Sequence, residues 1–412
     1  MEFIADFHIH SKYSRATSSN MDLTHIAEWA QLKGIALMGT GDFTHHLWLE
    51  ELKANLEDLG NGLFKYQKTY FILTTEVSNI YSKRGKTYRI HNIIFSPSFK
   101  TVDKINEVLT RFGNLSSDGR PILGLDVKEL ARIIFDIDEN CILVPGHIWT
   151  PWFSLFGSMS GFDRMEDCFE EYTSHIFACE TGLSSDPKMN WRLSSLDRIT
   201  LISNSDSHSP SKIGREANVF NCELDYKTLR QVLKTKDRNR FLYTIEFFPE
   251  EGKYHFDGHR LCGIRWSPPH TKQHKGICPR CARPVTVGVM NRVEQLADRP
   301  EGFVPENTIP FKNLIPLEEI IAEAKGIAKG AVSLEREYRS VIAKLGNEFE
   351  ILTKIPEKDL FKNLSPKLAE GIIRMRQGKI SIKPGFDGEY GIISIFGDEE
   401  KQRKHDEQLN LF

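Results

Sequence analysis

Histidine and carboxylate residues recur beside short apolar runs in the first half of the sequence. They are His8, His10, Asp42, Glu76, His91, His147, Asp206 and His208. Imidazole and carboxylate groups together suit zinc, manganese or iron, so the set has the composition of a metal site. A single histidine near a strand end is more often a surface or core residue than a ligand. The whole set is too regular for chance, and it predicts a site for more than one metal ion.

Two pairs within this set share a spacing, HxH at residues 8 and 10 and DxH at residues 206 and 208. Side chains alternate along extended backbone, so both members of each pair point to the same side. A bridging carboxylate such as Glu76 would let two ions lie about 3.5–4 Å apart, and such ions lower the pKa of a shared water. Chemistry carried out by that water needs no nucleophilic serine or cysteine. The candidate catalytic residues are His8, His10, Glu76 and Asp206.

The elements that must position these residues alternate in the order of a βα-repeating fold. The expected strands cover residues 3–7, 35–38, 70–74, 89–95, 141–144, 176–179 and 200–203. The expected helices cover residues 21–33, 102–112, 127–135 and 226–233. Most candidate ligands then lie at the carboxyl ends of strands, which is where barrel enzymes place their active sites. We therefore expect an α/β barrel.

A second cluster of metal-binding residue types lies farther along the chain. Its members are His259, Cys262, Cys278 and Cys281. The HxxC and CxxC pairs are separated by fifteen residues, which is the spacing of a zinc ribbon with one histidine in place of a cysteine. His270 and His274 are alternative fourth ligands, and His259 is preferred because HxxC forms a second tight knuckle. The spacing predicts a structural zinc ion.

The segment around this second cluster is basic. Residues 258–299 include eight Lys or Arg and two acidic residues, a net charge of +6. The candidate DNA-binding residues are Arg260, Arg265, Arg280 and Arg283. Excess arginine and an accessible Trp266 suit a phosphate backbone and a stacked base, although a charged run is often only a solvated face.

The overall composition limits the possible partners and the cellular compartment of the protein. The 412 residues carry 54 Lys and Arg against 56 Asp and Glu, so a nucleic-acid surface must be local. The sequence shows no signal-peptide pattern and no membrane-length apolar run, and seven cysteines suit a reducing compartment, so we expect a cytoplasmic protein. Changes in residue composition and periodicity along the chain predict a catalytic barrel over 1–240, a zinc module over 241–305, a helical C-terminal domain over 306–397 and a polar tail over 398–412.

The barrel motifs DFHIHS, TGDF, TTEVS, VPGH and SNSDSH, together with His91, resemble those of the PHP (polymerase and histidinol phosphatase) superfamily. The resemblance spans roughly residues 1–240 and implies a distorted barrel of seven βα units with two or three metal ions, which hydrolyses phosphoesters. The implied ligands of one ion are His8, His10, Glu76 and Asp206. The implied ligands of a second ion are Glu76, His91 and His147.

The sequence departs from that superfamily at two ligand positions. Phe43 stands where many members have a metal-binding histidine, and the usual further histidine is missing from residues 11–15. Both departures affect a third ion, so we expect two metal ions. Asp42 and His208 remain as candidate ligands for a third.

The order of barrel, zinc module and helical domain is similar to that of the endonuclease Q family. Two stretches carry this resemblance, ETGLSSDPKMNWRLSSLD in the barrel and CPRCARPVTVGVMNRVEQLADRPEG beyond it. The resemblance implies a DNA repair endonuclease that cuts 5′ of a deaminated base (hypoxanthine, uracil or xanthine) or an abasic site and leaves a 3′ hydroxyl. It implies damaged DNA as partner, and Zn²⁺, Mn²⁺ or Mg²⁺ in the barrel. Trp149, Trp152 and Phe153 could line the pocket for an extruded base.

The sequence QLNLF resembles the short peptide by which bacterial repair and replication proteins bind the β sliding clamp. The candidate clamp-binding residues are Gln408, Leu409, Leu411 and Phe412. Polar residues precede them, and the apolar side chains could fill a groove on a partner. The resemblance implies a bacterial source. The alternative function is a PHP-type phosphatase for a small phosphomonoester, which would leave the zinc module and QLNLF without a role.

Overall fold

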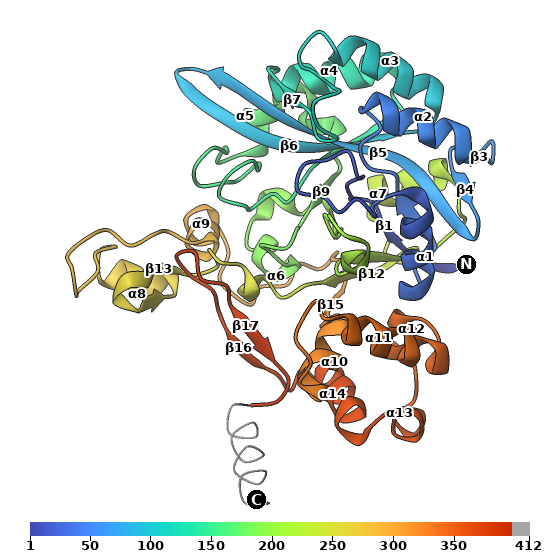
Figure 1. The fold of residues 1–412 in the computed structure, drawn as a ribbon. Helices are drawn as coiled ribbons and strands as arrows, with labels where there is room; N and C mark the ends of the chain where they lie inside the picture. Colours follow the sequence, from blue (N-terminus) through green and yellow to red (C-terminus); the bar gives the residue numbers. More distant parts are fainter. Residues whose placement is uncertain (398–412) are drawn as a thin grey trace, which may run out of the picture.

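The computed structural model describes residues 1–397, and one mixed β-sheet lies at its centre (Figure 1). The strands of this sheet are β1 (Glu2–Asp6), β2 (Leu37–Gly39), β3 (Glu57–Asp58), β4 (Phe64–Tyr66), β5 (Thr69–Lys83), β6 (Lys86–Ser96), β7 (Ile122–Leu123), β8 (Ile142–Pro145), β11 (Ala217–Asn221), β12 (Phe241–Glu246) and β15 (Phe311–Asn313). A separate parallel pair consists of β9 (Ala178–Glu180) and β10 (Thr200–Ile202). All seven expected strands are present.

These strands curve into a distorted barrel. β1 pairs in parallel with β2, and β2 pairs in parallel with β5, as βα units require. A parallel bridge between Ile9 and Ser207 joins the segment after β1 to the segment after β10. Phe7 fills the interior against Phe95 and Phe220, with ring centroids 5.4 and 6.1 Å away. The predicted α/β barrel is confirmed.

One connection differs from the expected alternation of strand and helix. β5 and β6 form a long antiparallel hairpin instead of two parallel strands joined by a helix. Its turn residues Arg84 and Gly85 both have positive φ, 51° and 78°, and such a turn matches the twist of the paired strands. The strands are longer than their apolar runs because backbone pairing continues beyond the buried part. The hairpin places His91 opposite Ser78, two positions from Glu76.

Helices cover the outside of the barrel (Figure 1). They are α1 (Leu23–Lys33), α2 (His46–Asn55), α3 (Phe99–Leu109), α4 (Val127–Ile137), α5 (Met165–Phe169), α6 (Pro187–Asn190) and α7 (Tyr226–Thr235). The four expected helices are present, because each has a polar cap before an apolar face. Asp22 caps α1 by accepting from the backbone N–H of His25, and Gly34 ends the helix with φ 90°.

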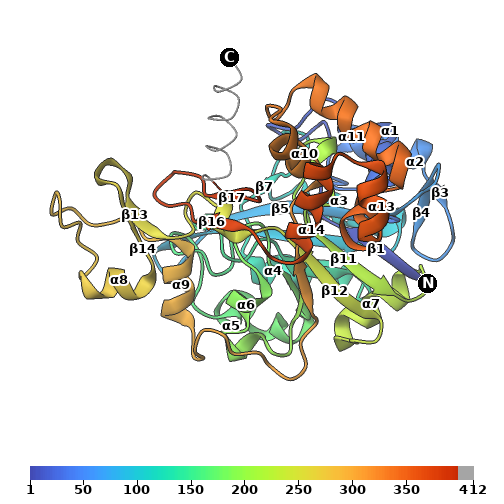
Figure 2. The same cartoon turned by 90° about the horizontal axis from the view of Figure 1, so that it is seen from below.

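Two further regions flank the barrel on different sides (Figures 1 and 2). The zinc module contains β13 (Asp257–His259), β14 (Ile264–Trp266), α8 (Pro268–Gln273) and α9 (Val289–Leu296). The helical region contains α10 (Leu317–Lys325), α11 (Val332–Leu345), α12 (Glu348–Thr353), α13 (Glu357–Asn363) and α14 (Pro366–Arg376). A hairpin of β16 (Ser381–Lys383) and β17 (Ile392–Ser394) returns from the helical region to the module, where Phe386 bridges Phe256.

The sheet of the barrel extends past the expected boundary at residue 240. β12 pairs with β11, and β15 pairs with β12, so residues 241–246 and 311–313 are part of the same sheet as β1. The zinc module is therefore an insertion between two strands of the barrel sheet. Among residues 1–397, no helix is long and apolar enough to span a lipid bilayer.

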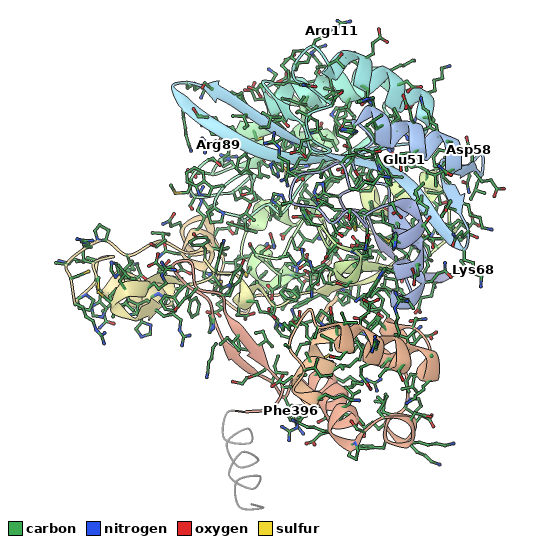
Figure 3. All side chains as sticks on the ribbon, in the orientation of Figure 1. Glu51, Asp58, Lys68, Arg89, Arg111 and Phe396 are labelled. Atoms are coloured by element: carbon green, nitrogen blue, oxygen red, sulfur yellow. The ribbon has the colours of Figure 1, made fainter. Side chains whose placement is uncertain are left out.

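The helical region is fixed to the barrel by a buried ion pair. Lys33 at the end of α1 lies 2.7 Å from Glu348 Oε2, and the two side chains are 2% and 5% exposed. The hydroxyl of Tyr338 donates to the same oxygen at 2.7 Å. Removing one partner of such a pair costs about 3–5 kcal/mol, because the other charge stays buried. Phe396, labelled in Figure 3, lies at the edge of the helical region, and the charged groups of Lys367 and Arg374 are 4.9 and 5.1 Å from the centre of its ring.

Candidate metal centre

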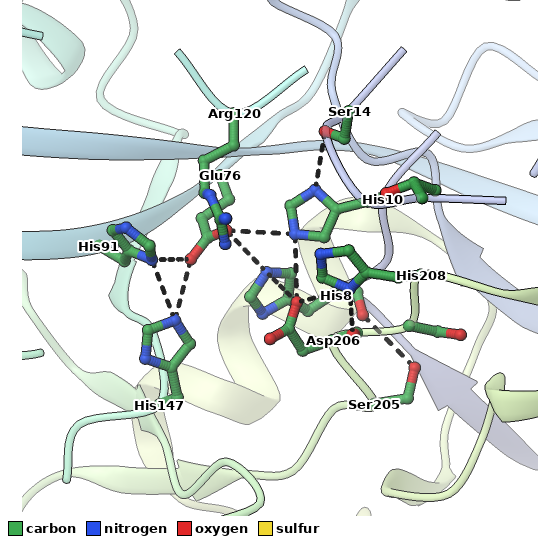
Figure 4. Close-up of polar contacts among 12 residues, drawn as sticks. His8, His10, Ser14, Glu76, His91, Arg120, His147, Ser205, Asp206 and His208 are labelled. Atoms are coloured by element: carbon green, nitrogen blue, oxygen red, sulfur yellow. Dashed lines mark hydrogen bonds and ion pairs between the residues drawn. The ribbon is translucent and has the colours of Figure 1, made fainter. Parts of the chain in front are cut away.

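A first group of ligand atoms lies where β1, β5 and the segment after β10 meet (Figure 4). Nε2 of His10 is 3.2 Å from Oε2 of Glu76 and 3.1 Å from Oδ1 of Asp206. Nε2 of His8 is 3.4 and 3.7 Å from the same two oxygens. Both Nε2 atoms and Oδ1 of Asp206 are buried without a hydrogen-bond partner. Unpaired buried polar atoms are costly, so their convergence on one point fits a bound cation.

A second group shares Glu76 with the first. Oε1 of Glu76 lies 2.7 Å from Nδ1 of His91 and 3.0 Å from Nε2 of His147. The two imidazole nitrogens are 3.1 Å apart. Each oxygen of Glu76 thus faces a different group, which is the arrangement of a carboxylate that bridges two ions.

Carboxylates behind the two motif histidines fix the orientation of the rings. Nδ1 of His10 lies 3.0 Å from Oδ1 of Asp42, and Nδ1 of His8 lies 3.0 Å from Oε1 of Glu180. When Nδ1 carries the proton and donates it to the carboxylate, Nε2 presents its lone pair to the first group. Such carboxylate–histidine pairs are typical behind metal ligands.

Glu180 connects the two groups and is not among the residues predicted from the sequence. Its Oε2 accepts from the backbone N–H of His147 at 2.8 Å, while Oε1 accepts from Asn204 at 2.8 Å and faces His8. It follows the expected strand 176–179 directly, so the same strand-end rule that selects Glu76 would have found it. One buried carboxylate therefore positions a residue of each group.

Asp42 and His208 are not gathered into either group. Oδ2 of Asp42 accepts from the backbone N–H and the hydroxyl of Ser11 at 2.6 and 2.7 Å, and from Ser14 at 2.9 Å. Asp42 therefore lies behind His10. His208 lies at the rim, with its ring 4.5 Å from that of His10. Within residues 1–397, the barrel residues form the two groups expected for two ions. Asp42 and His208, the candidates for a third ion, do not form a further group there.

The backbone at the site explains how the two motifs meet. His10 donates its N–H to the carbonyl of Ser207 at 2.9 Å, so the middle residues of HIH and DSH lie side by side. Asp206 has φ 46°, and His147 and Asp42 have φ 29° and 49°. The predicted extended backbone of DxH is wrong at Asp206, which lies in the left-handed region. Such conformations cost about 1–3 kcal/mol each and persist mostly at functional sites.

Buried charge dominates the electrostatics of the site. Burial opposes protonation of His8, but Glu180, Glu76 and Asp206 raise its pKa well above the ordinary value. Burial also opposes ionisation of Glu76, yet His91, Arg120 and His8 lower its pKa well below the usual range. A metal ion held by these carboxylates would displace protons from the imidazoles that coordinate it.

The zinc module gathers its four predicted residues. His259, Cys262, Cys278 and Cys281 present ligand atoms within 4.8 Å of one another, and Nε2 of His259 is 3.7 Å from Sγ of Cys281. The alternative ligands point elsewhere, since His270 pairs with the hydroxyl of Ser267 and His274 stacks on Trp266. One imidazole and three thiol groups this close together fit a structural zinc ion.

The four arginines predicted to contact DNA face solvent. Arg260, Arg265, Arg280 and Arg283 are exposed. The module is held against the barrel by Arg292 of α9, which donates to the carbonyl of Phe156 at 2.9 Å and to Asp163 at 2.6 Å. Those partners lie in the loop that follows His147, so this loop connects the module to the metal centre.

The same loop carries the three aromatic residues expected near an extruded base. Trp149 is buried and donates its indole N–H to Asn190 at 2.7 Å. Phe153 packs on the ring of His91 with centroids 4.9 Å apart. Trp152 is 44% exposed, and Arg89 of the β5–β6 hairpin lies 5.2 Å from its ring (Figure 3). Of the three, Trp152 is therefore the one available to a ligand.

Comparison with known proteins gives matches along the whole chain. A family model described as the MJ0043 C-terminal domain matches residues 316–379. The protein MJ0043 of Methanocaldococcus jannaschii is 34% identical over 270 residues, which cover 63% of this chain and 33% of that protein. The chain thus corresponds to about a third of the length of that relative.

Two solved structures are similar over nearly their full length. One is the lesion-specific endonuclease PfuEndoQ from Pyrococcus furiosus, with a TM-score of 0.85 and 29% identity over 98% of this chain and 99% of that chain. The other is an endonuclease Q complex with a 27-mer duplex substrate with an abasic lesion at the active site, with a TM-score of 0.85 and 30% identity. It covers 97% of this chain and 98% of that chain. The similarity includes barrel, zinc module and helical region together.

Proposed function

We propose that this chain, which belongs to the endonuclease Q family, is a metal-dependent DNA repair endonuclease that cuts the phosphodiester bond on the 5′ side of a damaged nucleotide. The proposed lesions are hypoxanthine, uracil, xanthine and abasic sites. Water adds to phosphorus, the P–O3′ bond breaks and the leaving oxygen takes a proton. The products are a 3′ hydroxyl and a 5′ phosphate that stays with the lesion.

The observation that carries this proposal is the pair of ligand groups that share Glu76. We assign His8, His10, Glu76 and Asp206 to one divalent ion, and Glu76, His91 and His147 to a second. The mixed imidazole and carboxylate donors suit Zn²⁺ or Mn²⁺, and Mg²⁺ is the third candidate. When bound, the ions supply a water of lowered pKa and neutralise charge on the phosphoryl oxygens.

The remaining residues of the site orient these ligands. Asp42 and Glu180 hold the rings of His10 and His8 so that both Nε2 atoms face the first group. The hydroxyl of Thr150 lies 3.2 Å from Nδ1 of His147 and orients that ring in the second ligand group. Preorganised ligands of this kind keep the reacting groups in place without reorganisation during the reaction.

The damaged nucleotide must leave the base stack to reach this buried site. A cavity of about 460 Å³ lies beside the metal centre, lined by residues that include Thr150, Leu183, Arg215, Tyr254 and Tyr390. Thr150 contacts His147, and Arg215 donates to the carbonyl of Asp206 at 3.3 Å, so the cavity and the metal centre share a wall. Its size suits one nucleoside, and we assign it to the extruded residue.

The zinc module supplies the duplex-binding surface in this proposal. A zinc ion held by His259 and three cysteines would stabilise a fold with few apolar contacts of its own. Its exposed arginines Arg260, Arg265, Arg280 and Arg283 would contact phosphates. The connection of Arg292 to the loop after His147 would hold this surface at a fixed distance from the cut site.

A nicking assay tests the proposal. Wild-type protein and an Asp206→Ala variant are incubated with duplexes carrying one hypoxanthine, one uracil or only normal bases, with and without divalent metal. We expect a metal-dependent nick 5′ of the lesion by the wild type and none by the variant. Asp136→Ala is the matched control, because Asp136 lies on α4, is 62% exposed, pairs with Arg132 and belongs to neither ligand group of the metal centre. Absence of lesion-dependent nicking, with hydrolysis of a small phosphomonoester instead, would favour the alternative phosphatase.

We further propose that QLNLF binds the bacterial β sliding clamp. Residues Gln408, Leu409, Leu411 and Phe412 lie outside the described residues, so the sequence alone supports this assignment. Deleting residues 408–412 is expected to leave nicking unchanged and to abolish retention of the protein on immobilised clamp. Equal retention of the full and shortened chains would contradict the assignment.

A further inference from the structure

Arg120 reaches the metal centre from a loop outside every predicted motif. Its Nη1 donates to Oε2 of Glu76 at 3.1 Å, the oxygen that faces His8 and His10 (Figure 4). Among residues 1–397, no other lysine or arginine side chain pairs with a ligand carboxylate of the barrel. A single positive side chain therefore stands beside the reacting groups.

Most donors of this guanidinium are free. The bond to Glu76 is the one side-chain hydrogen bond that Arg120 makes within the part of the chain that the structure describes. A guanidinium carries five N–H donors in a planar fork that matches two phosphate oxygens. The carboxylate oxygen has a second lone pair, so a metal ion on Glu76 leaves the bond to Arg120 possible.

Exposure shows on which side a substrate enters. The side chains of His8, His10 and Glu76 are at most 1% exposed. Arg120 is 29% exposed, Asp206 25% and His208 31%, so these three form the open rim of the centre. A phosphate that approaches the two ligand groups from solvent reaches them through this rim, which includes Arg120.

The backbone holds this arginine in a fixed position. Gly119 donates its N–H to the carbonyl of Tyr13 at 3.2 Å, and its own carbonyl accepts from the hydroxyl of Thr44 at 3.2 Å. A Cβ on Gly119 would lie only 2.2 Å from Oδ2 of Asp42, so only glycine permits this approach. On the other side, Pro121 accepts from the N–H of Ser78 on β5 at 2.9 Å. Arg120 is thus anchored between the Asp42 loop and the strand that carries Glu76.

The cations next to the sequence motifs are engaged elsewhere. Lys12 pairs with Glu51 at 2.9 Å, and Arg15 is 79% exposed beside Asp118. Arg215 donates to the carbonyls of Ser205 and Asp206 and so supports backbone. Of the positive side chains around the motifs, Arg120 is the one whose geometry fits the reacting phosphate.

We propose that Arg120 is a catalytic residue that donates to a nonbridging oxygen of the scissile phosphate and stabilises the negative charge that grows there during hydrolysis. This inference rests on the proposed phosphodiester hydrolysis. As hydroxide adds and the P–O3′ bond breaks, charge accumulates on the nonbridging oxygens, and a preoriented guanidinium at the rim stabilises it. The arginine gains no proton and loses none in this step.

The test compares Arg120→Met, Arg120→Lys and the control Arg132→Met, which removes an exposed arginine of α4. Each protein is assayed on a lesion duplex and on bis(4-nitrophenyl) phosphate, a phosphodiester without a base. We expect Arg120→Met to lower kcat about 10²- to 10³-fold, the effect of removing a donor to developing charge, with little change in KM. Arg120→Lys should recover part of the rate, because it keeps the charge without the planar fork.

Two measurements without turnover separate this role from support of Glu76. Bound metal in Arg120→Met should equal that of the wild type by elemental analysis. Duplexes with a stereopure methylphosphonate at the cut site should bind the Ca²⁺-loaded wild type about tenfold more weakly for one diastereomer, the loss of one charge-assisted bond. Arg120→Met should show no such difference.

Three outcomes would overturn the proposal for Arg120. They are a kcat of Arg120→Met close to that of the wild type on both substrates, a loss of metal in proportion to the loss of rate, and an unchanged diastereomer preference in the variant. A wild type that hydrolyses bis(4-nitrophenyl) phosphate but ignores lesions would refute only the lesion-specific function. In that case the Arg120→Met comparison on the small diester still decides the role of Arg120.

Discussion

The barrel centre and the zinc module both gather metal-binding side chains, but they are built in opposite ways. The zinc residues lie within 23 positions of the sequence, on two tight knuckles. The barrel residues come from five separate segments between His8 and Asp206 and meet only through strand pairing. The first site needs local chain geometry, whereas the second needs the complete barrel.

The surroundings of the two sites differ as strongly as their construction. The barrel ligands are buried and are oriented by Asp42 and Glu180, while an open rim remains at Arg120. The zinc residues include the exposed Cys281, and exposed arginines surround them. A closed set of four ligands suits a structural ion, and an oriented set with an open side suits chemistry. The zinc module therefore suits a structural role that shapes a surface, and the barrel centre suits a catalytic role.

The largest effect should follow from removing the shared carboxylate. Glu76→Gln keeps the shape of the side chain but loses the charge that both ligand groups need, so both barrel ions should be lost. We expect nicking to fall by about 10³-fold or more, with zinc in the module retained, because two-ion catalysis loses both components. Elemental analysis and single-turnover nicking measure the two effects. Retention of both barrel ions would contradict the bridging role.

The converse experiment removes the module's metal. Cys278→Ser should lose about one zinc per chain and weaken duplex binding about 10- to 100-fold, since the arginines lose their scaffold. Hydrolysis of bis(4-nitrophenyl) phosphate should be unchanged, because the barrel ions remain. Cys222→Ser, a buried barrel cysteine outside both sites, is the control. Equal losses on the duplex and on the small diester would show that the two sites are not independent.

A smaller effect should follow from the carboxylate that links the two barrel groups. Glu180→Gln removes the negative acceptor behind His8, and loss of such a partner typically lowers metal affinity about 10- to 100-fold. Glu216→Gln is the matched control, because Glu216 is equally buried and its pKa is raised well above the usual value by burial and by Glu246. Metal titration by calorimetry checks both variants. Equal affinities in the two variants would remove Glu180 from the site.

The last effect concerns stability and not activity, through the pH dependence of barrel unfolding. Burial raises the pKa of Glu246 from 4.5 to about 8. Between these values the unfolded chain has lost this proton and the folded chain keeps it, so this group makes the free energy of unfolding fall as pH rises. The loss is complete above pH 8, and it amounts to at most about 1.4 kcal/mol per pH unit.

The measurement compares the wild type with Glu246→Gln by urea unfolding at pH 5 and pH 8. The variant should lose less stability across this interval, because its side chain cannot ionise. Cys278→Ser should keep the full decrease of the wild type, since the group lies in the barrel and not in the zinc module. A decrease of equal size in Glu246→Gln would contradict the assignment.

The sequence predicted the strands better than their connections. All seven expected strands are present, because apolar runs mark buried β-structure directly, but β11 and β12 of the same sheet were not expected. The antiparallel β5–β6 hairpin was not expected, because a turn of two residues such as Arg84 and Gly85 leaves little trace against a βα pattern. The candidate ligands were found by residue type at strand ends, and Glu180 was missed although the same rule applies to it. Arg120 follows no rule of spacing, so no pattern could have selected it.

The sequence by itself determined the residue types of both metal sites and the local geometry of the zinc knuckles, because HxxC and CxxC fix their own turns. It also determined the family, through motifs spread over the barrel and the module. Only the tertiary structure decided which carboxylates face an ion and which stand behind a histidine, as with Glu76 and Asp42. Only the tertiary structure shows that Arg120 lies at the rim of the metal centre. The physical reason is that strand register and loop packing set distances between residues far apart in the chain, and no local pattern encodes those distances.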